Sequence, residues 1–378
     1  MEETITMKNR KLTTNTFLSI LCDDPLEINE LLKKPIPAYT KQDISETKVG
    51  TKTIFKLTPA KAHYQKRLND RFFSRIPLNQ SSVAYTKRKS YLDMFEPHRN
   101  SYRFLRLDIK SFFHSISRDL LKDTLSSHVS EDLFFSSNYA KQTLIDALLN
   151  ILTINLGDTY KDKDLTNRDI LPIGFPSSPV VSNIVFRKFD FLIQKLCSEN
   201  NIIYTRYADD MLFSSTADSK FIHSEHFIRE VSYILSLGGF KLNGDKTIKE
   251  KNMISINGYV IESNGKEKNS GHIRLSNKKT AMICKLIDKL DKNVAHKDIL
   301  KKITGLKENH IKVSFDKGRN EFLAQYYKSQ IINLLAGYRA YLISIIKFNK
   351  LYGCVEDKYL DKYQNIIDDI QKHLFRLV

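Results

Sequence analysis

Cysteine is scarce in this chain, which has four in 378 residues. Cys22, Cys197, Cys284 and Cys354 stand far apart and form no CxxC pair, a spacing that argues against a zinc site. They also lack the pattern of a disulfide framework, which fits a reducing compartment. We therefore expect a cytoplasmic protein without a zinc site or structural disulfides.

Targeting segments, repeats and low-complexity linkers are absent from the sequence. The N-terminal stretch "MEETITMKNRKLTTNTF" has no apolar core and no small-residue cleavage site, so it does not read as a signal peptide. The most apolar stretch, "IINLLAGYRAYLISIIKF" from Ile331, carries Arg339 in its middle. A charge there favours a buried helix of a soluble protein over a membrane span, and we expect no membrane association.

Acidic residues are too few to balance the basic ones, and the net charge is +17 with a pI of about 9.4. A chain this basic favours a nucleic-acid partner. The alternative is a protein that is basic only for solubility. Lysines recur in the C-terminal third, where they would follow a nucleic-acid backbone without reading bases or, alternatively, form a solvated helix face: Lys278, Lys279, Lys285, Lys289, Lys297, Lys301, Lys302 and Lys307.

Two adjacent carboxylates interrupt the apolar run "YTRYADDMLF", where neighbouring like charges repel each other. The run predicts a strand, a tight turn and a second strand, with Asp209 and Asp210 at the turn. "YRFLRLDIKSFF" alternates like a strand that ends at Asp108. Three carboxylates gathered there would bind Mg²⁺ and support nucleotidyl transfer. The alternative is structural: a strand-end cap at Asp108 and an ordinary turn at the pair.

The remaining patterns predict a mixed centre and a helical C-terminal part. "TKTIFKLTPAKAHYQKRLNDRFFSR" reads as a strand and then a helix, and "LPIGFPSSPVVSNIVF" as a loop followed by a helix capped by Ser178. "KLNGDKTIKE" and "ISINGYVIE" read as short strands with turns at Asn243-Gly244 and Asn257-Gly258. From about Gly271 onward the pattern is helical. The predicted class is α+β followed by an all-α region.

Five segments, in this order, resemble the motifs of bacterial reverse transcriptases of the retron, group II intron and defence-associated kinds: "LDIKSFFHSI", "LPIGFPSSPVVSN", "YADD", "KLNGDKT" and "INGYVI". "LLAGYRAYLISI" is similar to a helix of that family's thumb. The resemblance implies a right-hand polymerase, with fingers and a palm containing an antiparallel sheet, followed by an all-α thumb. It implies an N-terminal extension over 1–50, fingers and palm over 51–262, and a helical thumb over 263–378.

The resemblance assigns roles to individual residues. Asp108, Asp209 and Asp210 would hold two Mg²⁺ ions, with Mn²⁺ as an alternative, helped by the Ile109 carbonyl. Lys246 would approach the leaving pyrophosphate, where an ammonium neutralises charge or donates a proton; its alternative is a surface lysine. The other positions divide into a nucleotide-binding set and a nucleic-acid-binding set: Lys52, Lys56, Arg67, Phe113, Gly174, Pro176, Ser177 and Asn183 for the nucleotide, and Tyr207, Asn257, Gly258, Lys278 and Lys279 for the nucleic acid.

Within these sets Phe113 matches the steric gate that favours dNTP over rNTP. The structural alternative places both Phe112 and Phe113 in the core, and one of them is expected there. Asn183 has an equally plain alternative as a satisfied helix residue. His272, His296 and His310 are isolated, and we expect structural or surface roles for them. The sequence contains no HExxH, no HNH-like cluster and no second carboxylate set of the RNase H kind.

Two departures from the family pattern favour its defence-associated members. Ile173 stands where the family usually has Gln, and "INGYVI" stands where retrons typically read Val-Thr-Gly. We therefore predict an RNA-directed DNA polymerase that copies a dedicated non-coding RNA, in anti-phage defence, with dNTPs and an RNA–DNA hybrid as partners. A second reverse transcriptase, an effector protein or an oligomer are further candidate partners. The rivals are a retron enzyme making short branched DNA, a template-independent or protein-primed polymerase, and a non-catalytic RNA-binding scaffold.

Overall fold

The computed structural model describes residues 11–50, 52–158, 160, 163–263, 271–306, 308, 311 and 318–377. Lys307 and His310 lie outside these ranges. The chain divides into two compact units. The first contains residues 1–94, 105–215 and 219–249, and the second contains 95–104, 216–218 and 250–378. The division at residue 250 assigns the strands after it to the unit that holds the C-terminal helices, whereas the sequence predicted a boundary at 262.

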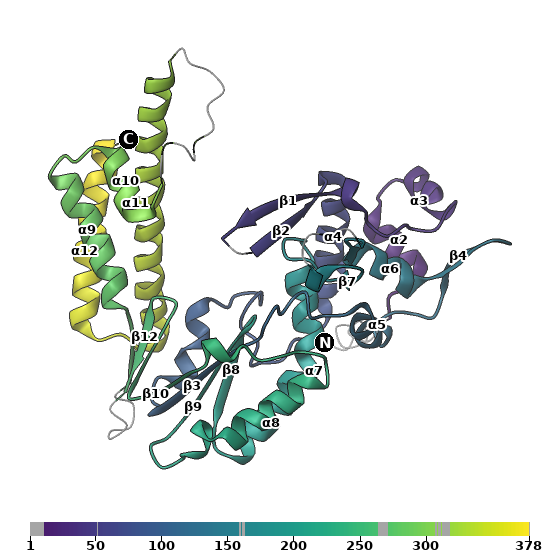
Figure 1. Ribbon diagram of the computed structural model, residues 1–378, viewed down its shortest axis with the longest axis horizontal. Coiled ribbons are helices and arrows are strands. Elements are labelled where there is room, and N and C mark those ends of the chain that lie inside the picture. The colour runs from purple at the N-terminus through teal and green to yellow at the C-terminus, as the bar shows by residue number, and fades with distance from the viewer. Residues whose placement is uncertain are drawn as a thin grey trace, which may run out of the picture. The chain divides into compact units, whose positions relative to one another are not determined.

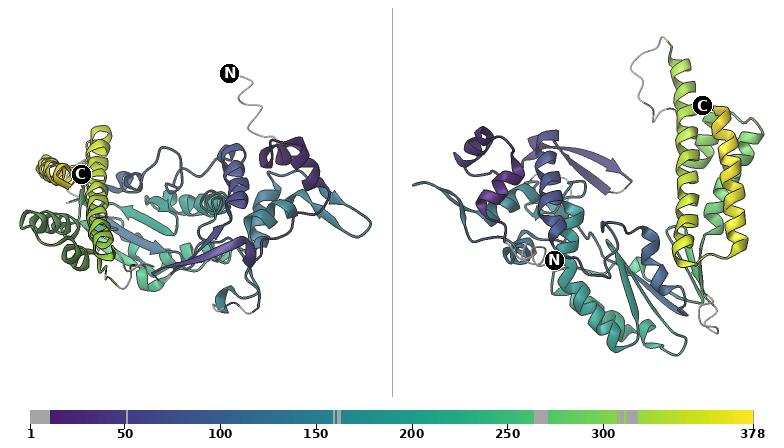
Figure 2. Two further views of the ribbon diagram at one scale, coloured as in Figure 1. Left: turned by 90° about the horizontal axis from the view of Figure 1, so that it is seen from above. Right: turned by 180° about the vertical axis from the view of Figure 1, so that it is seen from behind.

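The first unit begins with two short helices, α2 (Thr14–Leu21) and α3 (Pro25–Leu32). The hairpin of β1 (Ile44–Val49) and β2 (Lys52–Leu57) follows, and then α4 (Pro59–Arg71). In β2 the side chains alternate, so that Phe55 is buried while Lys52 and Lys56 are exposed on the other face. Two views show the hairpin extending beside α4 (Figures 1 and 2). The predicted strand and helix are both confirmed.

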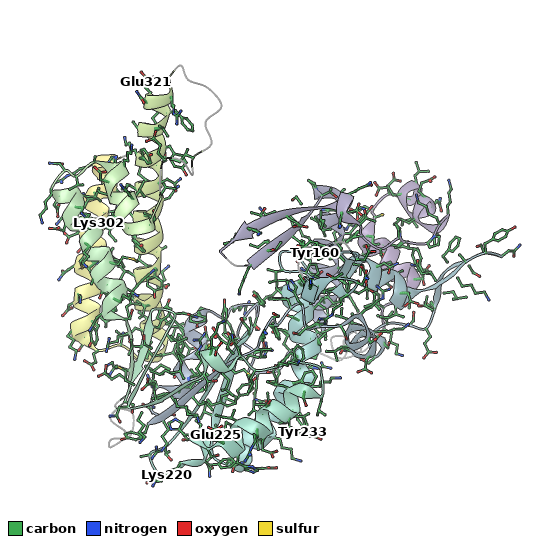
Figure 3. The ribbon with its side chains drawn as sticks, viewed as in Figure 1. Tyr160, Lys220, Glu225, Tyr233, Lys302 and Glu321 are labelled. Atoms are coloured by element: carbon green, nitrogen blue, oxygen red, sulfur yellow. The ribbon has the colours of Figure 1, made fainter. Side chains whose placement is uncertain are left out.

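A second group of elements packs on α4 and the start of the chain. Its helices are α5 (Arg118–Ser126) and α6 (Leu144–Leu152), and its short strands form two antiparallel pairs: β4 (Leu133–Ser136) with β5 (Lys141–Thr143), and β6 (Ile154–Asn155) with β7 (Asp169–Ile170). Tyr160, labelled in Figure 3, donates its hydroxyl to Glu46 on β1 (3.3 Å) and so ties this group to the first hairpin.

The central sheet of the first unit has the strand order β10-β3-β9-β8. It comprises β3 (Arg103–Asp108), β8 (Ile203–Tyr207), β9 (Asp210–Ser215) and β10 (Ile248–Lys251). The first unit also contains two helices, α7 (Ser178–Glu199) and α8 (Glu225–Ser236). On α8 the side chains of Phe227, Val231 and Leu235 are buried, whereas Tyr233 is exposed (Figure 3). This amphipathic pattern explains why these residues form a helix.

Helix α7 begins one residue before the predicted first turn. Ser177 occupies the N-cap position with helical backbone angles (φ −86°, ψ −23°) and makes no capping hydrogen bond, while its hydroxyl donates to Gln65 on α4 (2.9 Å). The stretch "KLNGDKTIKE" forms the predicted turn as a 3-10 turn over Gly244–Lys246, followed by strand β10, while before the turn Leu242 makes only an isolated bridge with Ile109. The geometry of the turn is set by Asp108, whose carbonyl accepts a hydrogen bond from the Asn243 N–H (2.8 Å).

The second unit contains an antiparallel sheet, β11 (Met253–Ile256), β12 (Tyr259–Glu262) and β13 (His272–Leu275). Ile256 pairs with Tyr259 across a two-residue turn in which Asn257 and Gly258 both have positive φ, of 50° and 90°. This confirms the predicted turn. The prediction of helix from Gly271 is wrong for 272–275, because these residues pair with β12 before the helices begin.

Four helices follow, α9 (Asn277–Asp291), α10 (His296–Thr304), α11 (Arg319–Tyr352) and α12 (Asp357–Leu377), and they pack against one another. Helix α11 is long and apolar enough to cross a membrane by length and composition alone, and 28% of its most apolar window is buried. Its buried side chains form one stripe, at the spacing of a bundle helix: Leu323, Tyr327, Ile331, Leu335, Leu342, Ile345 and Phe348. The predicted buried helix is therefore buried along one face.

Candidate active site

Asp108 and Asp209 meet where strand β3 ends beside the β8–β9 hairpin. The register of the hairpin pairs Tyr207 with Asp210, which leaves Ala208 and Asp209 as its two-residue turn. The N–H of Ile109, the residue after Asp108, donates to the carbonyl of Asp209 (3.0 Å). The predicted tight turn is thus confirmed, and the backbone alone brings the strand end and the turn together.

The turn adopts a backbone conformation that a non-glycine residue rarely takes. Ala208 has φ of 55°, in the left-handed region, which costs a residue with a Cβ of the order of 1 kcal/mol. The guanidinium of Arg206 donates to the Ala208 carbonyl (2.9 Å) and is itself completely buried. Strain of this kind persists where surrounding contacts hold it, and here it aims Asp209 toward β3.

Two of the three carboxylates have cationic partners. Asp108 is buried, and its side chain accepts hydrogen bonds from Lys246 (3.0 Å) and Asn243 (3.2 Å). Asp210 accepts from Arg106, with 2.9 Å between Nε and the carboxylate oxygen. Arg106 precedes Asp108 by two residues and therefore emerges from the same face of β3. The sequence showed this spacing, but an arginine beside a metal ligand was not predicted.

Asp209 differs from its two neighbours because no ion pair is found for it among the described residues. Burial raises the pKa of Asp209 above its ordinary value, and the charges of Asp210 and Asp108 raise it further, while Lys52 lowers it. Asp209 is therefore the carboxylate that a cation would stabilise most directly.

The three carboxylates do not form a closed metal cage. Within the described ranges, no group of three or more His, Cys, Asp or Glu side chains lies close enough to hold an ion. Asp210 and Asp108 are instead paired with Arg106 and Lys246. The charges of both still act on Asp209, and a shared metal site of the three stays a prediction. The oxygen donors of Asp108 and Asp209 still suit a hard divalent cation. These two residues would hold one, and a bound cation would supply charge neutralisation for phosphate groups.

Aromatic rings lie around the turn. Phe112 is in the core with Phe186 and Phe240, whereas Phe113 is only partly buried, which settles which of the two rings is core. The Phe113 ring lies 6.4 Å from that of Tyr85, and Tyr85 lies 6.3 Å from Tyr207. Tyr85 was missed at the sequence level because it sits in an irregular segment without a periodic pattern.

The predicted loop before α7 is fastened to α4. The Pro176 carbonyl accepts from Asn69 (2.7 Å), and the Ser177 N–H donates to Gln65 (3.2 Å). Ser177 is buried, and its N–H and hydroxyl both donate to Gln65, so its side chain is structural, while a contact of this stretch with the nucleotide stays a prediction. Gly174 has φ of 104°, and a Cβ there would lie 2.4 Å from the Phe55 carbonyl oxygen, so only glycine fits.

Two further predicted nucleotide contacts have other partners in the structure. Arg67 donates hydrogen bonds from both terminal nitrogens to the Asp23 carboxylate and from Nε to the Ile20 carbonyl. It therefore anchors the N-terminal segment, and its donors are not directed at a triphosphate. Asn183 is buried, and its amide bonds the Ala84 carbonyl and Arg206. Lys52 and Lys56 remain exposed, and Lys52 is close enough to affect Asp209.

In the second unit the predicted nucleic-acid residues gather at the β11–β12 turn. Lys279 lies over the rings of Tyr338 (5.1 Å) and Tyr341 (5.4 Å). A Cβ on Gly258 would lie 3.4 Å from the Tyr341 hydroxyl and 3.9 Å from Lys279, so turn and helix approach closely. Asn257 and Lys278 are exposed beside them. The cation–π contacts order Lys279 without removing its charge.

Comparisons with known proteins agree with this geometry. A family model described as "Reverse transcriptase (RNA-dependent DNA polymerase)" matches residues 33–261. The chain is 30% identical over 190 residues to the Retron Ec83 reverse transcriptase of Escherichia coli, covering 50% of this chain and 57% of that protein. It is 31% identical over 193 residues to the Retron Ec73 reverse transcriptase of the same organism, covering 50% and 56%. The matches thus span little more than half the length of these relatives.

Among solved structures, a telomerase from Candida albicans in complex with a fragment of telomeric RNA matches with a TM-score of 0.41 and 13% identity. The match covers 92% of this chain and 61% of the telomerase chain. That likeness is distant, and the sequence family is the stronger finding.

Proposed function

Because this chain belongs to the reverse transcriptase (RNA-dependent DNA polymerase) family, we propose that it is an RNA-directed DNA polymerase that copies a dedicated non-coding RNA. The observation that carries the proposal is the hairpin turn that holds Asp209 against the end of β3, where the Ile109 N–H bonds the Asp209 carbonyl at 3.0 Å. A binding scaffold has no need of a strained turn that presents a partly buried carboxylate for which the described residues offer no ion pair.

The chemistry follows from these groups. The 3′ hydroxyl of the growing strand attacks the α-phosphorus of a dNTP, one P–O bond forms, and the bond to pyrophosphate breaks. Asp108 and Asp209 would hold divalent cations, two Mg²⁺ or Mn²⁺ ions in this proposal, with the Ile109 carbonyl as a further donor and Asp210 beside them. Lys246, half exposed beside Asp108, is placed to neutralise or protonate the leaving pyrophosphate.

The template and product need a positive surface, which the net charge of +17 supports. Lys278 and Lys279 next to the Asn257-Gly258 turn would contact the phosphates of an RNA–DNA hybrid without reading its sequence. Such contacts make binding depend steeply on salt.

The function is tested by incubating the purified protein with a primed RNA template, labelled dNTPs and Mg²⁺. We expect DNA synthesis that EDTA abolishes and added Mg²⁺ restores. Sequencing the nucleic acid that copurifies from cells identifies the template, and we expect cDNA copied from one RNA. Homopolymers or simple repeats would instead indicate template-independent synthesis. RNA binding with no synthesis under any metal would leave only the scaffold function.

Phe113 carries a prediction on sugar selection. Its partly exposed ring is the group placed to collide with a 2′ hydroxyl, so Phe113→Val should raise rNTP incorporation relative to dNTP by about 10- to 100-fold. Single-nucleotide incorporation with dATP and ATP measures the ratio. Phe191→Ala, which truncates an exposed ring on α7, is the matched control and should leave the ratio unchanged. An unchanged ratio in Phe113→Val would remove Phe113 from the sugar pocket.

A retron-type product is the second candidate, because the relatives at 30% and 31% identity are named retron reverse transcriptases. A retron-type enzyme would leave cDNA joined to RNA through a branched nucleotide. Debranching treatment followed by electrophoresis separates that product from unbranched cDNA. Anti-phage defence by a cytoplasmic enzyme is the biological role we propose, and phage plaque counts on cells with and without the active protein test it. A second polymerase, an effector or a further copy of the chain would copurify if the role needs one.

A further inference from the structure

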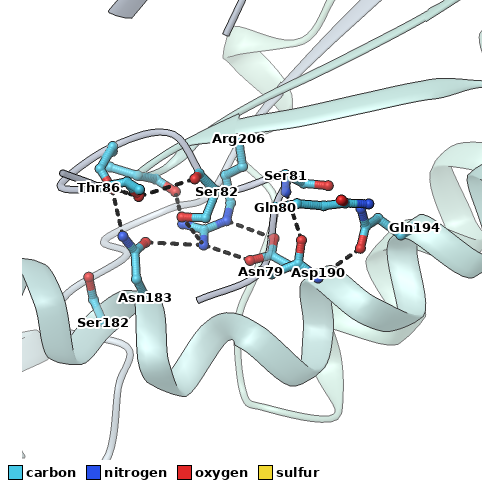
Figure 4. Close-up of polar contacts among 12 residues, drawn as sticks. Asn79, Gln80, Ser81, Ser82, Thr86, Ser182, Asn183, Asp190, Gln194 and Arg206 are labelled. Carbon is cyan, nitrogen blue, oxygen red and sulfur yellow. Dashed lines mark hydrogen bonds and ion pairs between the residues drawn. The ribbon is translucent and has the colours of Figure 1, made fainter. Parts of the chain in front are cut away.

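A segment far from the hairpin in sequence, residues 79–86, is joined to strand β8 by an isolated parallel bridge between Ser82 and Arg206. Figure 4 shows the polar side chains around Arg206. The Arg206 N–H donates to the Ser81 carbonyl (2.8 Å), and the Val83 N–H donates to the Arg206 carbonyl (2.8 Å). The segment is also fixed to α7, because Asn79 donates to Gln194 (2.7 Å). The segment therefore contacts strand β8, which ends at the active-site turn, and helix α7, which precedes β8 in the chain.

The side chain of Arg206 forms the centre of a buried polar network. It makes a two-pronged ion pair with Asp190 on α7 (2.9 and 2.7 Å), and both side chains are completely buried. It also donates to the carbonyl of Ala208 (2.9 Å), to the Ser82 hydroxyl (3.2 Å) and to the Asn183 carbonyl oxygen (3.1 Å). A guanidinium with this many fixed acceptors holds each of them in place.

Asn183 extends the network to the backbone next to Tyr85. Its NH₂ group donates to the Ala84 carbonyl (2.6 Å), while its oxygen accepts from Arg206. One chain of hydrogen bonds therefore runs from the carbonyl of Ala208, directly before Asp209, to the carbonyl of Ala84, directly before Tyr85. The network fixes the positions of Tyr85 and Asp209 relative to each other.

The side chain of Tyr85 is partly exposed on a strained backbone. The φ of Tyr85 is 58°, a strained value for a bulky residue, and 43% of its surface is exposed although its backbone neighbour Ala84 is buried. Its ring faces Phe113 and Tyr207. Burial raises the pKa of the Tyr85 hydroxyl, and the nearby Tyr207 and Asp209 raise it further. Tyr85 therefore lies close enough to the Asp209 carboxylate to be affected by its charge.

We propose that Tyr85 contacts the incoming nucleotide, forming with Phe113 an aromatic slot for its sugar and base, and that Asn183 and Arg206 are positioning residues that set this slot against Asp209. The proposal rests on the polymerase function proposed above. It gives Asn183, predicted from sequence to touch the nucleotide, an indirect role through Ala84 and Tyr85.

The first part of the test addresses Tyr85 itself. Since the residue is partly exposed, Tyr85→Ala should fold, raise KM for dNTPs by about 10-fold or more and change kcat much less. Tyr85→Phe retains the ring and should restore KM to within about twofold of the parent protein. If Tyr85→Ala leaves KM unchanged, Tyr85 does not contact the nucleotide.

The second part addresses positioning. Asn183→Asp retains an acceptor for Arg206 but removes the donor to the Ala84 carbonyl, so it should raise KM as Tyr85→Ala does. The double variant should show no further increase. Asn183→Ala, which removes both bonds, serves if the aspartate variant does not fold. If KM for dNTPs rises in the double variant by the product of the two single effects, Asn183 does not act through Tyr85.

Tyr204→Phe is the matched control, because it removes a buried hydrogen bond of the same network at its far end, the bond from the Tyr204 hydroxyl to Asp190 (2.8 Å). Hydrogen exchange of residues 80–88 reports the positioning without any turnover. We expect faster exchange in Asn183→Asp and parent-like exchange and KM in Tyr204→Phe. Equal effects in both variants would mean general loosening and would overturn the positioning role.

Equilibrium binding of a fluorescent dATP separates this inference from the proposed function. If the parent protein synthesises no DNA but binds dATP and loses that binding in Tyr85→Ala, the polymerase function fails and the slot stands. If synthesis proceeds and dATP binding is the same in both proteins, the function stands and the slot fails.

Discussion

Asp209→Asn is expected to reduce DNA synthesis by at least about 10²-fold, the loss typical of removing one group that stabilises transition-state charge. The asparagine keeps the shape of the turn but removes the anionic oxygen that would hold a cation. Primer extension under single-turnover conditions measures the loss. Asp361→Asn, an exposed change on α12, is the control for charge alone and should retain full activity. Activity within threefold of the parent in Asp209→Asn would refute the assignment of the metal site.

The same variant should be more stable than the parent when no metal is bound. The pKa of Asp209 is raised in the folded protein, chiefly by burial, so the charged form opposes folding. Its contribution to stability is fully present below the unfolded pKa, about 3.9, and is lost as pH rises through the folded value. Asp209→Asn should therefore raise Tm at pH 7 in EDTA, and the gain should shrink toward pH 4. Loss of activity with a gain in stability separates a functional residue from a structural one.

Asp190→Asn is expected to destabilise the protein by about 3–5 kcal/mol, the cost of leaving one member of a buried ion pair without its partner. Arg206 is completely buried and would keep its charge without Asp190, because the ordinary pKa of a guanidinium lies far above 7. Urea unfolding at constant slope measures the change.

The matched control is an exposed ion pair, 3.1 Å apart, between Lys188, which lies on α7 like Asp190, and Asp123 on α5. Asp123→Asn should cost no more than about 1 kcal/mol, since water screens this pair. If Asp190→Asn costs as little as Asp123→Asn, the buried network does not hold α7 and β8 together, and the positioning role of Arg206 loses its basis.

The hairpin with Asp209 and the strand that ends at Asp108 were predictable because their information is local. An alternating apolar run interrupted by polar residues predicts where the strand lies, where the turn lies and which side chains face the core. The Asn257-Gly258 turn was predictable for the same reason, since those two residues adopt positive φ at little cost. Helix α7 begins one residue earlier than predicted, and the Ser177 hydroxyl before it is bonded to Gln65, a partner far away in the chain that local sequence does not reveal.

The partners of each polar side chain were not predictable, because they come from distant segments. Lys246 was predicted near the site by the resemblance and Arg106 was not predicted there. The pairing of Arg106 with Asp210 and of Lys246 with Asp108 depends on how the sheet and the 3-10 turn pack. Asp190 and Arg206 had one visible sign, a charge within an otherwise apolar pattern. Such a charge must find a partner when buried, but the pattern does not say which one.

The sequence by itself determined the family, the secondary structure around the active site, and the identity of Asp108 and Asp209. These follow from side-chain periodicity and from residue types whose chemistry is the same in any fold. Only the tertiary structure decided that Asp210 is paired with Arg106, that Asn183 and Ser177 are buried supports, and that Tyr85 stands beside Phe113. Those outcomes depend on contacts between residues 23 to 112 positions apart, and a buried polar group takes whichever partner the packed chain brings within reach.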